Sequence, residues 1–272
     1  MNIILSEYYK IDIIDYKTYN DGIIFFINDS YYYFFKCDYD EEYLEYIFNI
    51  VSNIKIKLHS FVFNKHNMIL SDGYVLIKLN YLINKIDFID LQKFNIKVDS
   101  NEKYDFINNW RNKIDYLENK VFDLNDKVII YSFDYYSGIV EMVLSYFKNI
   151  KYNGELYLCH KKFSMNSIDF YNPVNITFDI YLRDIASYII YNKKIDLLYE
   201  KLIYLNDYER LYLFSRLVLP FDYFYLLEDI INGLDKKREL EKYIESKNYY
   251  ELYIKKIESI FKINIFKWIK KE

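Results

Sequence analysis

The residues whose side chains could do chemistry gather between positions 154 and 190. His160 lies in the segment CHKKF, Asp179 follows the segment NITF, and Asp184 precedes the apolar run IASYII. Phosphoryl transfer uses groups of this kind, because it needs a carboxylate that activates the acceptor and oxygen ligands that hold Mg²⁺ across the phosphates. A histidine and two carboxylates on neighbouring elements therefore define the first candidate site.

The order of these elements, a His-bearing turn, a strand and a helix that opens on Asp, resembles the catalytic core of kinase-like phosphotransferases. That resemblance places Lys162 where such enzymes carry the Asp of a His-Gly-Asp turn, and Ser167 where they carry an Asn. The metal-binding Asp of the next strand corresponds either to Asn175 or to a displaced Asp179. The frame is kept, while the expected base and metal ligands are replaced.

Several segments in a fixed order narrow the resemblance. They are SFDYYSGIVEMVLSYF, CHKKF, residues 173–179, RDIASYI and RLVLPFDYFYLLE at 216–228. Together they resemble the YutH-like spore-coat family, a divergent relative of the CotS and aminoglycoside-phosphotransferase kinases. In that family the turn has the form Cys-His-x-basic-Phe, so Lys162 agrees with it. The family tends to keep an Asp at the position of Asn175, and this chain departs from it there.

The resemblance implies structural roles for two residues of this segment. Asp184 corresponds to the Asp that pins the His turn, since a carboxylate at a helix start can accept backbone N–H groups. His160 is then expected to hold the turn by hydrogen bonds, and no residue is assigned a catalytic role with confidence. Lys162 could attract an anionic phosphate as a point charge, or be a solvated turn residue.

Lys36 is a candidate for contact with a nucleotide. It ends an apolar strand and could imitate the strand lysine of kinases, with Glu42 or Glu45 as its ion-pair partner. Lysines at strand ends are common, however, and the preceding turn around Gly22 lacks the several glycines that a phosphate-covering loop needs. The residue types favour a surface lysine over a nucleotide ligand.

The elements around these residues predict a two-lobe α+β fold of the protein-kinase-like, aminoglycoside-phosphotransferase-like type. GIIFFIND (22–29) and SYYYFFKCD (30–38) predict a hairpin, residues 40–54 a helix, and residues 59–81 three more strands. From about residue 88 apolar residues recur at helical spacing. We expect a small β-rich N-lobe over 1–86 and a larger helical C-lobe over 87–272, with the degenerate catalytic-type turn at 157–167.

Composition excludes several classes of protein. A hydrophobic content of 52% with only 5 Gly and 2 Pro argues against disorder, and a net charge of −4 with mixed signs gives no basic surface for nucleic acid. The two cysteines are expected to be free thiols in a reducing cytoplasm. No run reaches the ~20 apolar residues of a spanning helix. The 34 Tyr fit an AT-rich coding sequence; functional cross-linking of coat tyrosines is the alternative.

Together, these observations and the resemblance predict a catalytically degenerate kinase-like protein that serves as a scaffold or binding protein in sporulation. It would be made in the cytoplasm, reach the spore coat, contact other coat proteins and need no cofactor. The alternative is an active small-molecule or protein phosphotransferase that uses ATP and Mg²⁺, with Asp179 as metal ligand. The C-terminal stretch is a candidate docking helix, with lysines from Lys256 onward among the aromatic and apolar residues Phe261, Phe266, Trp268 and Ile269.

Overall fold

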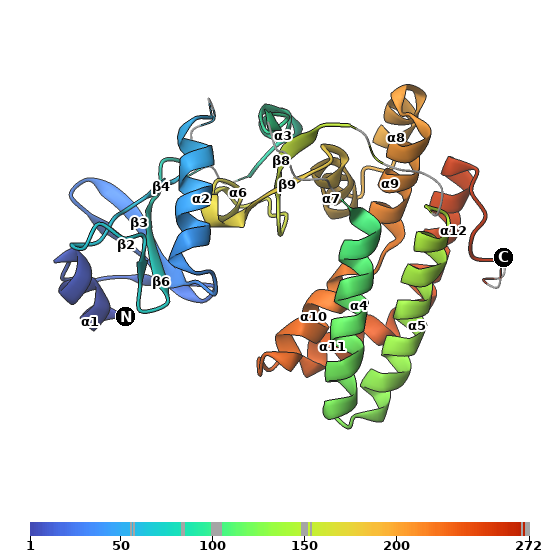
Figure 1. Cartoon of the computed structure of the whole chain (residues 1–272), viewed down its shortest axis with the longest axis horizontal. Helices are drawn as coiled ribbons and strands as arrows, with labels where there is room; N and C mark the ends of the chain where they lie inside the picture. Colours follow the sequence, from blue (N-terminus) through green and yellow to red (C-terminus); the bar gives the residue numbers. More distant parts are fainter. Residues whose placement is uncertain are drawn as a thin grey trace. The chain divides into compact units, whose positions relative to one another are not determined.

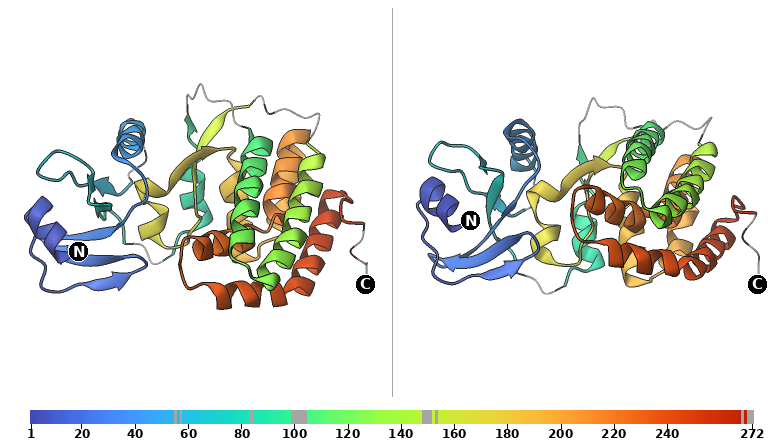
Figure 2. Two further views of the ribbon diagram at one scale, coloured as in Figure 1. Left: turned by 60° about the horizontal axis from the view of Figure 1, so that its bottom comes forward. Right: turned by 90° about the horizontal axis from the view of Figure 1, so that it is seen from below.

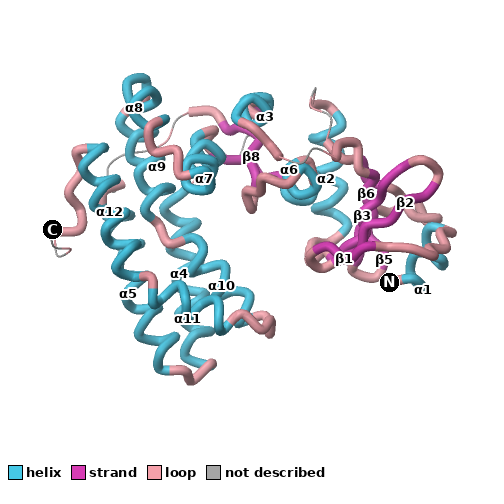
Figure 3. Tube along the Cα trace, turned by 180° about the vertical axis from the view of Figure 1, so that it is seen from behind, coloured by secondary structure: helices cyan, strands magenta, loops and turns pink. Residues whose placement is uncertain are grey.

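The computed structural model describes residues 1–54, 56, 58–82, 85–98, 105–147, 152, 154–267 and 269. The chain divides into two compact units. One consists of Met1–Val98 and Leu156–Asp184, the other of Asp99–Glu155 and Ile185–Glu272. Strands gather in the first unit, and the second is helical (Figure 3). The predicted lobes, 1–86 and 87–272, do not coincide with these units and stay a prediction.

The first unit contains an antiparallel sheet of six strands in the order β1-β2-β3-β6-β4, with β5 also paired to β6. The predicted hairpin is confirmed: Asn28 and Asp29 link β2 to β3 with positive φ, which short polar residues tolerate better than most. The strands are β1 (Lys17–Tyr19), β2 (Gly22–Ile27), β3 (Ser30–Lys36), β4 (Ser60–Phe61), β5 (Leu70–Ser71) and β6 (Tyr74–Lys78).

The two faces of this sheet bury different clusters. Helix α2 (Glu41–Ser52), capped by Asp40, packs Leu44 and Ile47 on the face that carries Tyr33 and Phe35 (Figure 1). The opposite face is covered from the N-terminal helices α1 (Asn2–Ile4) and η1 (Leu5–Tyr9), through Leu5. The period of two along β3 thus sends alternate aromatic residues into two cores.

A second, three-stranded antiparallel sheet in the same unit carries the His turn. It consists of β7 (Lys97–Val98), β8 (Leu156–His160) and β9 (Ile176–Asp179) in that order. Short helices flank it, namely α3 (Phe88–Lys93), α6 (Ser167–Phe170), η2 (Pro173–Asn175) and the start of α7 (Leu182–Asn192). The sequence did not predict β7, because two residues are too few to show an alternating pattern.

The second unit is built from helices with buried apolar stripes. Helices α4 (Phe106–Asp123) and α5 (Lys127–Ser145) lie side by side, joined by a short turn (Figure 2). Their buried residues include Trp110, Ile114 and Leu117 of α4 and Ile139, Val140 and Val143 of α5, and Asp105 and Asp126 cap their N-termini. The remaining elements are α8 (Leu197–Lys201), η3 (Leu202–Tyr204), α9 (Asp207–Val218), α10 (Phe221–Ile231), α11 (Lys237–Glu245) and α12 (Lys247–Phe261).

The last described helix ends before the C-terminal residues that the sequence suggested as part of a docking helix. Helix α12 ends at Phe261, and Phe266 lies fully buried beyond it. The Glu258 carboxylate accepts the backbone N–H groups of Ile265 and Phe266 at 2.6 and 2.8 Å, which fixes the chain after the helix. Trp268 lies outside the described residues. No helix that the structure describes is both long and apolar enough to cross a bilayer.

Candidate functional site

His160 ends strand β8 and is almost completely buried, with 1% of its surface exposed. Its Nδ1 lies 2.6 Å from Asp184 Oδ2, and its Nε2 lies 2.8 Å from the carbonyl oxygen of Phe170. The His160 backbone N–H also donates to Asp184 Oδ1 at 3.1 Å. A carbonyl oxygen only accepts hydrogen bonds, so Nε2 carries a hydrogen and Nδ1 is committed to the carboxylate. This imidazole has no free lone pair with which to act as a base.

Asp179 and Asp184 have different hydrogen-bond partners. Asp184, in the first turn of α7, holds His160 as just described. Asp179, at the end of β9, accepts from the Arg183 guanidinium at 2.7 Å and from the Ile180 N–H at 2.7 Å. Asp179 has 1% of its surface exposed, and both of its carboxylate oxygens accept hydrogen bonds from groups within the protein. A Mg²⁺ ion bound to Asp179 would have to share the carboxylate with the positive charge of Arg183.

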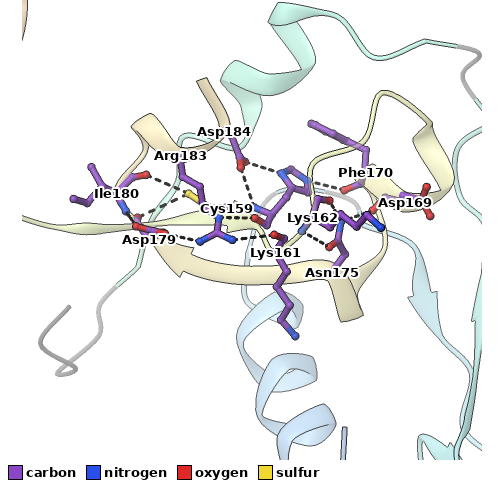
Figure 4. A network of polar contacts seen from close by, with 11 residues as sticks. Cys159, Lys161, Lys162, Asp169, Phe170, Asn175, Asp179, Ile180, Arg183 and Asp184 are labelled. Atoms are coloured by element: carbon purple, nitrogen blue, oxygen red, sulfur yellow. Dashed lines mark hydrogen bonds and ion pairs between the residues drawn. The ribbon is translucent and has the colours of Figure 1, made fainter. Parts of the chain in front are cut away.

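Arg183 was not predicted from the sequence as a site residue, yet it bonds to both strands that carry the site. Besides its bond to Asp179, its Nε donates to the His160 carbonyl at 2.7 Å and its Nη2 to the Lys161 carbonyl at 2.9 Å. The guanidinium thus binds the end of β8 and the end of β9 at once (Figure 4). Its position before Asp184 at a helix start was visible in the sequence, but its partners were not.

The turn after His160 is closed by Asn175. The Asn175 side-chain oxygen accepts the Lys162 N–H at 3.0 Å, and its NH₂ group donates to the carbonyls of Lys162 at 2.8 Å and Asp169 at 3.1 Å (Figure 4). The Lys162 side chain itself is exposed and forms no ion pair within the part of the chain that the structure describes. The Asn175 amide therefore braces the turn.

Ser167 opens helix α6 and is buried. Its hydroxyl donates to the Tyr81 carbonyl at the long distance of 3.5 Å, and its own carbonyl lies 3.1 Å from His59 Nε2. His59 Nδ1 in turn accepts the Asn80 N–H at 3.1 Å. Ser167 thus links the segment after the turn to the chain that follows strand β6.

Asp169 is a further carboxylate near the turn, and the sequence analysis did not propose it as a site residue. It accepts hydrogen bonds from the hydroxyl groups of Tyr19 at 2.7 Å and Ser164 at 3.2 Å. Burial, followed by the neighbouring Asp169, raises the pKa of Tyr19 well above its ordinary range. Tyr19 is the last residue of strand β1. The end of this strand is therefore bonded directly to the segment after His160.

Lys36 and Lys161 occupy different environments. Lys36 is exposed at the end of β3, on the face opposite α2 by the alternation of strand residues, and forms no ion pair with Glu42 or Glu45. Lys161 is half-buried, with Nζ 3.6 Å from the Tyr39 ring centre and 4.5 Å from that of Tyr43. Burial lowers the pKa of Lys161 to about 8. The half-buried cation beside α2 is thus Lys161, which the sequence did not single out, and not Lys36.

Protein side chains fill the α2 face of the sheet. Ile168 and Val174, from the segment after His160, belong to the same buried cluster as Tyr33 and Phe35 of β3, and Phe178 packs against it. A cavity of about 600 Å³ lies elsewhere, along the second half of α2 and strand β4, where Phe48, Phe61 and His59 contribute to its lining. None of the predicted site residues lines it. No group of three metal-ligating side chains occurs in the described part of the chain.

Comparisons with known proteins agree with this architecture. Residues 101–257, more than half of the chain, match the model of the family described as "Spore coat putative kinase YutH". An aminoglycoside phosphotransferase from Alicyclobacillus acidocaldarius superposes with a TM-score of 0.58 at 8% identity, over 92% of this chain and 93% of that one. At such identity the likeness establishes the fold alone, and it confirms the predicted kinase-like α+β architecture. No curated protein matches the sequence.

Proposed function

Because the chain belongs to the spore-coat family described as "Spore coat putative kinase YutH", we propose that it acts in the spore coat as a kinase-fold binding protein that transfers no phosphate. The supporting observation is Asn175. By resemblance to kinases it is one of the two candidates for the metal-ligand position, beside Asp179, and it uses both ends of its amide to close the turn at Lys162. A residue committed to two backbone groups of its own turn is a poor ligand for Mg²⁺, which prefers charged oxygens in near-octahedral geometry.

The neighbouring groups support the same proposal. His160 has no free lone pair, and Asp179 is neutralised by Arg183. In active phosphotransferases catalysis rests on positioned metal ions and an acceptor-activating carboxylate. In this chain the corresponding groups serve a rigid turn instead. The turn with its α2 and β1–β2 neighbours would then be a docking surface for other coat proteins, with no ATP or Mg²⁺ needed.

A phosphotransferase remains the second candidate, and one observation favours it. Asp169 lies in the segment after the turn and is only half-buried, and two hydroxyl groups bond to its carboxylate, with no cation among the described residues. Such a carboxylate could accept a proton from a substrate hydroxyl. Under this alternative ATP and Mg²⁺ would bind, and Asp169 rather than a residue of the usual turn would be the base.

One experiment separates the two candidates. Purified protein is incubated with γ-labelled ATP, with and without Mg²⁺, and its thermal unfolding is recorded in the same buffers. We expect no transfer and no Mg²⁺-dependent rise of the unfolding temperature. A ligand at 100 times its Kd would add about 2.7 kcal/mol, and each kcal/mol is worth roughly 2–4 °C in a chain of this size.

Two matched variants make the outcome decisive. Asp169→Asn removes the carboxylate charge, whereas Tyr19→Phe removes a hydrogen bond to it and keeps the charge. Mg²⁺-dependent transfer that is lost in Asp169→Asn and retained in Tyr19→Phe would overturn the proposal in favour of the enzyme. A thermal shift with ATP alone would instead contradict the expectation that no cofactor binds, while leaving catalysis absent.

A further inference from the structure

Arg216 is a buried cation without a counterion. It lies in the last turn of α9, with 7% of its surface exposed and its guanidinium carbon 3.9 Å from the centre of the Phe221 ring. Its Nε is enclosed by protein and has no hydrogen-bond acceptor, whereas the terminal amino groups are not enclosed in this way. No carboxylate pairs with Arg216 among the residues that the structure describes.

Two other cations that bridge helices in the described part of this unit are paired with carboxylates. Lys113 Nζ lies 2.9 Å from Glu228, and Lys237 Nζ lies 2.6 Å from Asp126. Both of these lysines are more exposed than Arg216, so they need a partner less. The most deeply buried of the three is therefore the one that lacks an anion.

This arrangement cannot be relieved by loss of a proton, because a guanidinium stays charged in proteins. The Phe221 ring attracts the charge through its π face, but it accepts no hydrogen bond from the enclosed Nε. Burying a charge without pairing it is among the most unfavourable arrangements in a protein interior. We propose that Arg216 binds a carboxylate supplied by a ligand or partner, on an aromatic platform formed by Phe221 and Trp110.

The surroundings favour an anion of single charge. Helix α10 begins at Phe221 with no side chain capping it, so its first N–H groups and its dipole favour an anion at that end. Asp222, exposed in the first turn, would repel a phosphate dianion more strongly than a carboxylate. The Trp110 ring meets Phe221 at 5.1 Å, which adds apolar surface for the group that carries the carboxylate. The preferred ligand class is therefore an aromatic or apolar carboxylate.

The test uses benzoate as the probe, benzamide as its uncharged counterpart and inorganic phosphate as the dianion, all at fixed ionic strength. Binding is followed by the fluorescence of Trp110 in a Trp268→Phe background and by the thermal midpoint. We expect saturable binding of benzoate, at least about tenfold weaker binding of benzamide, since charge-assisted bidentate pairs are among the strongest hydrogen bonds, and weaker binding of phosphate. Equal responses to benzoate and benzamide would overturn the proposal, and tighter binding of phosphate would overturn its carboxylate assignment.

The matched variant is Arg216→Met, which keeps an unbranched apolar stem on Phe221 and removes the charge. It should lose the benzoate response and retain the fold, judged by circular dichroism. If that variant does not fold, Arg216→Lys replaces it, with a loss of about tenfold in affinity, because an ammonium cannot pair with a carboxylate through two parallel N–H groups. Unchanged affinity in the folded variant contradicts the proposal. The proposal is independent of phosphate transfer, since it involves none of the residues of the His160 turn.

Discussion

At the scale of single residues, polar groups in this chain are used to lock backbone segments together. Asp184, Arg183 and Asn175 each bind two or more backbone atoms or neighbouring side chains around His160. A buried polar group that loses its partner costs about 1–3 kcal/mol, and more when it is charged. The stability of the first unit should therefore respond strongly to changes at these few positions.

His59 should make stability depend on pH. Burial lowers its pKa to about 4, against an ordinary value of 6.5, while the Ser167 carbonyl acts more weakly in the opposite direction. Below pH 6.5 His59 becomes protonated in the unfolded chain but stays neutral in the folded protein. Its contribution to the free energy of unfolding is therefore complete above pH 6.5 and is lost as the pH falls toward 4. The loss between pH 7 and pH 5 should be about 2 kcal/mol.

The measurement for His59 is urea unfolding at pH 7 and pH 5 for the wild type and for His59→Gln. Glutamine can keep one donor and one acceptor but does not titrate. The variant should show a pH dependence smaller by about 2 kcal/mol, after allowance for any loss common to both pH values. The same pH dependence in both proteins would show that His59 does not carry it.

Tyr19→Phe should destabilise the protein by about 1–2 kcal/mol, because it removes a hydrogen bond to a carboxylate that joins residues 150 positions apart. Urea unfolding at pH 7 provides the measurement. Tyr31→Phe is the control, since Tyr31 lies exposed on strand β3 of the same sheet. A difference of less than ~0.5 kcal/mol between the two variants would mean that the Tyr19–Asp169 bond adds little.

At the scale of elements, the effect of replacing a glycine depends on the helix or strand that contains it and on the atoms packed against it. Two glycines of this chain differ in this respect. Gly138 lies within helix α5, and a Cβ added there would meet no atom within 4 Å. Gly22 begins strand β2, and a Cβ there would collide with the backbone of Phe34 and Phe35 on β3. The first glycine is dispensable, whereas the second allows the two strands to approach.

We expect Gly138→Ala to stabilise the protein by about 0.5–1 kcal/mol, because alanine loses less backbone entropy in a helix. Gly22→Ala should destabilise it by about 1–3 kcal/mol through overpacking. Thermal unfolding of both variants beside the wild type gives the two signs in one experiment. Destabilisation by Gly138→Ala would indicate that this position has a contact not seen in the helix.

At the scale of the whole molecule, the two thiols should report unfolding of the unit that contains them. Cys37 and Cys159 are both buried thiols of the unit formed by Met1–Val98 and Leu156–Asp184, and burial raises the pKa of Cys37. Since the thiolate is the reactive form, neither should react readily with a disulfide reagent at pH 7 in the folded protein. We expect labelling to follow the unfolding rate, with two thiols released at once in guanidinium. Fast labelling of one thiol under native conditions would reveal local opening around it.

The sequence by itself determined the parts of this protein that depend on local rules. The apolar and aromatic runs in residues 22–36, with Asn28 and Asp29 between the strands, specified the first hairpin, and the acidic start and apolar spacing of residues 40–52 specified α2. The order of the segments around His160 indicated the family and the kinase-like fold. These features are written in neighbouring residues, so they can be recognised before any packing is known.

Only the tertiary structure decided which side chains meet. Arg183 joins Asp179 to two carbonyls of the turn, Tyr19 reaches Asp169 across 150 residues, and Arg216 is left beside Phe221 without an anion. Lys36 was a reasonable candidate by sequence, yet strand alternation turns it away from α2. Such pairings depend on which faces the folded elements present to one another. That choice is made by the burial of the whole apolar surface, so no short stretch of sequence contains it.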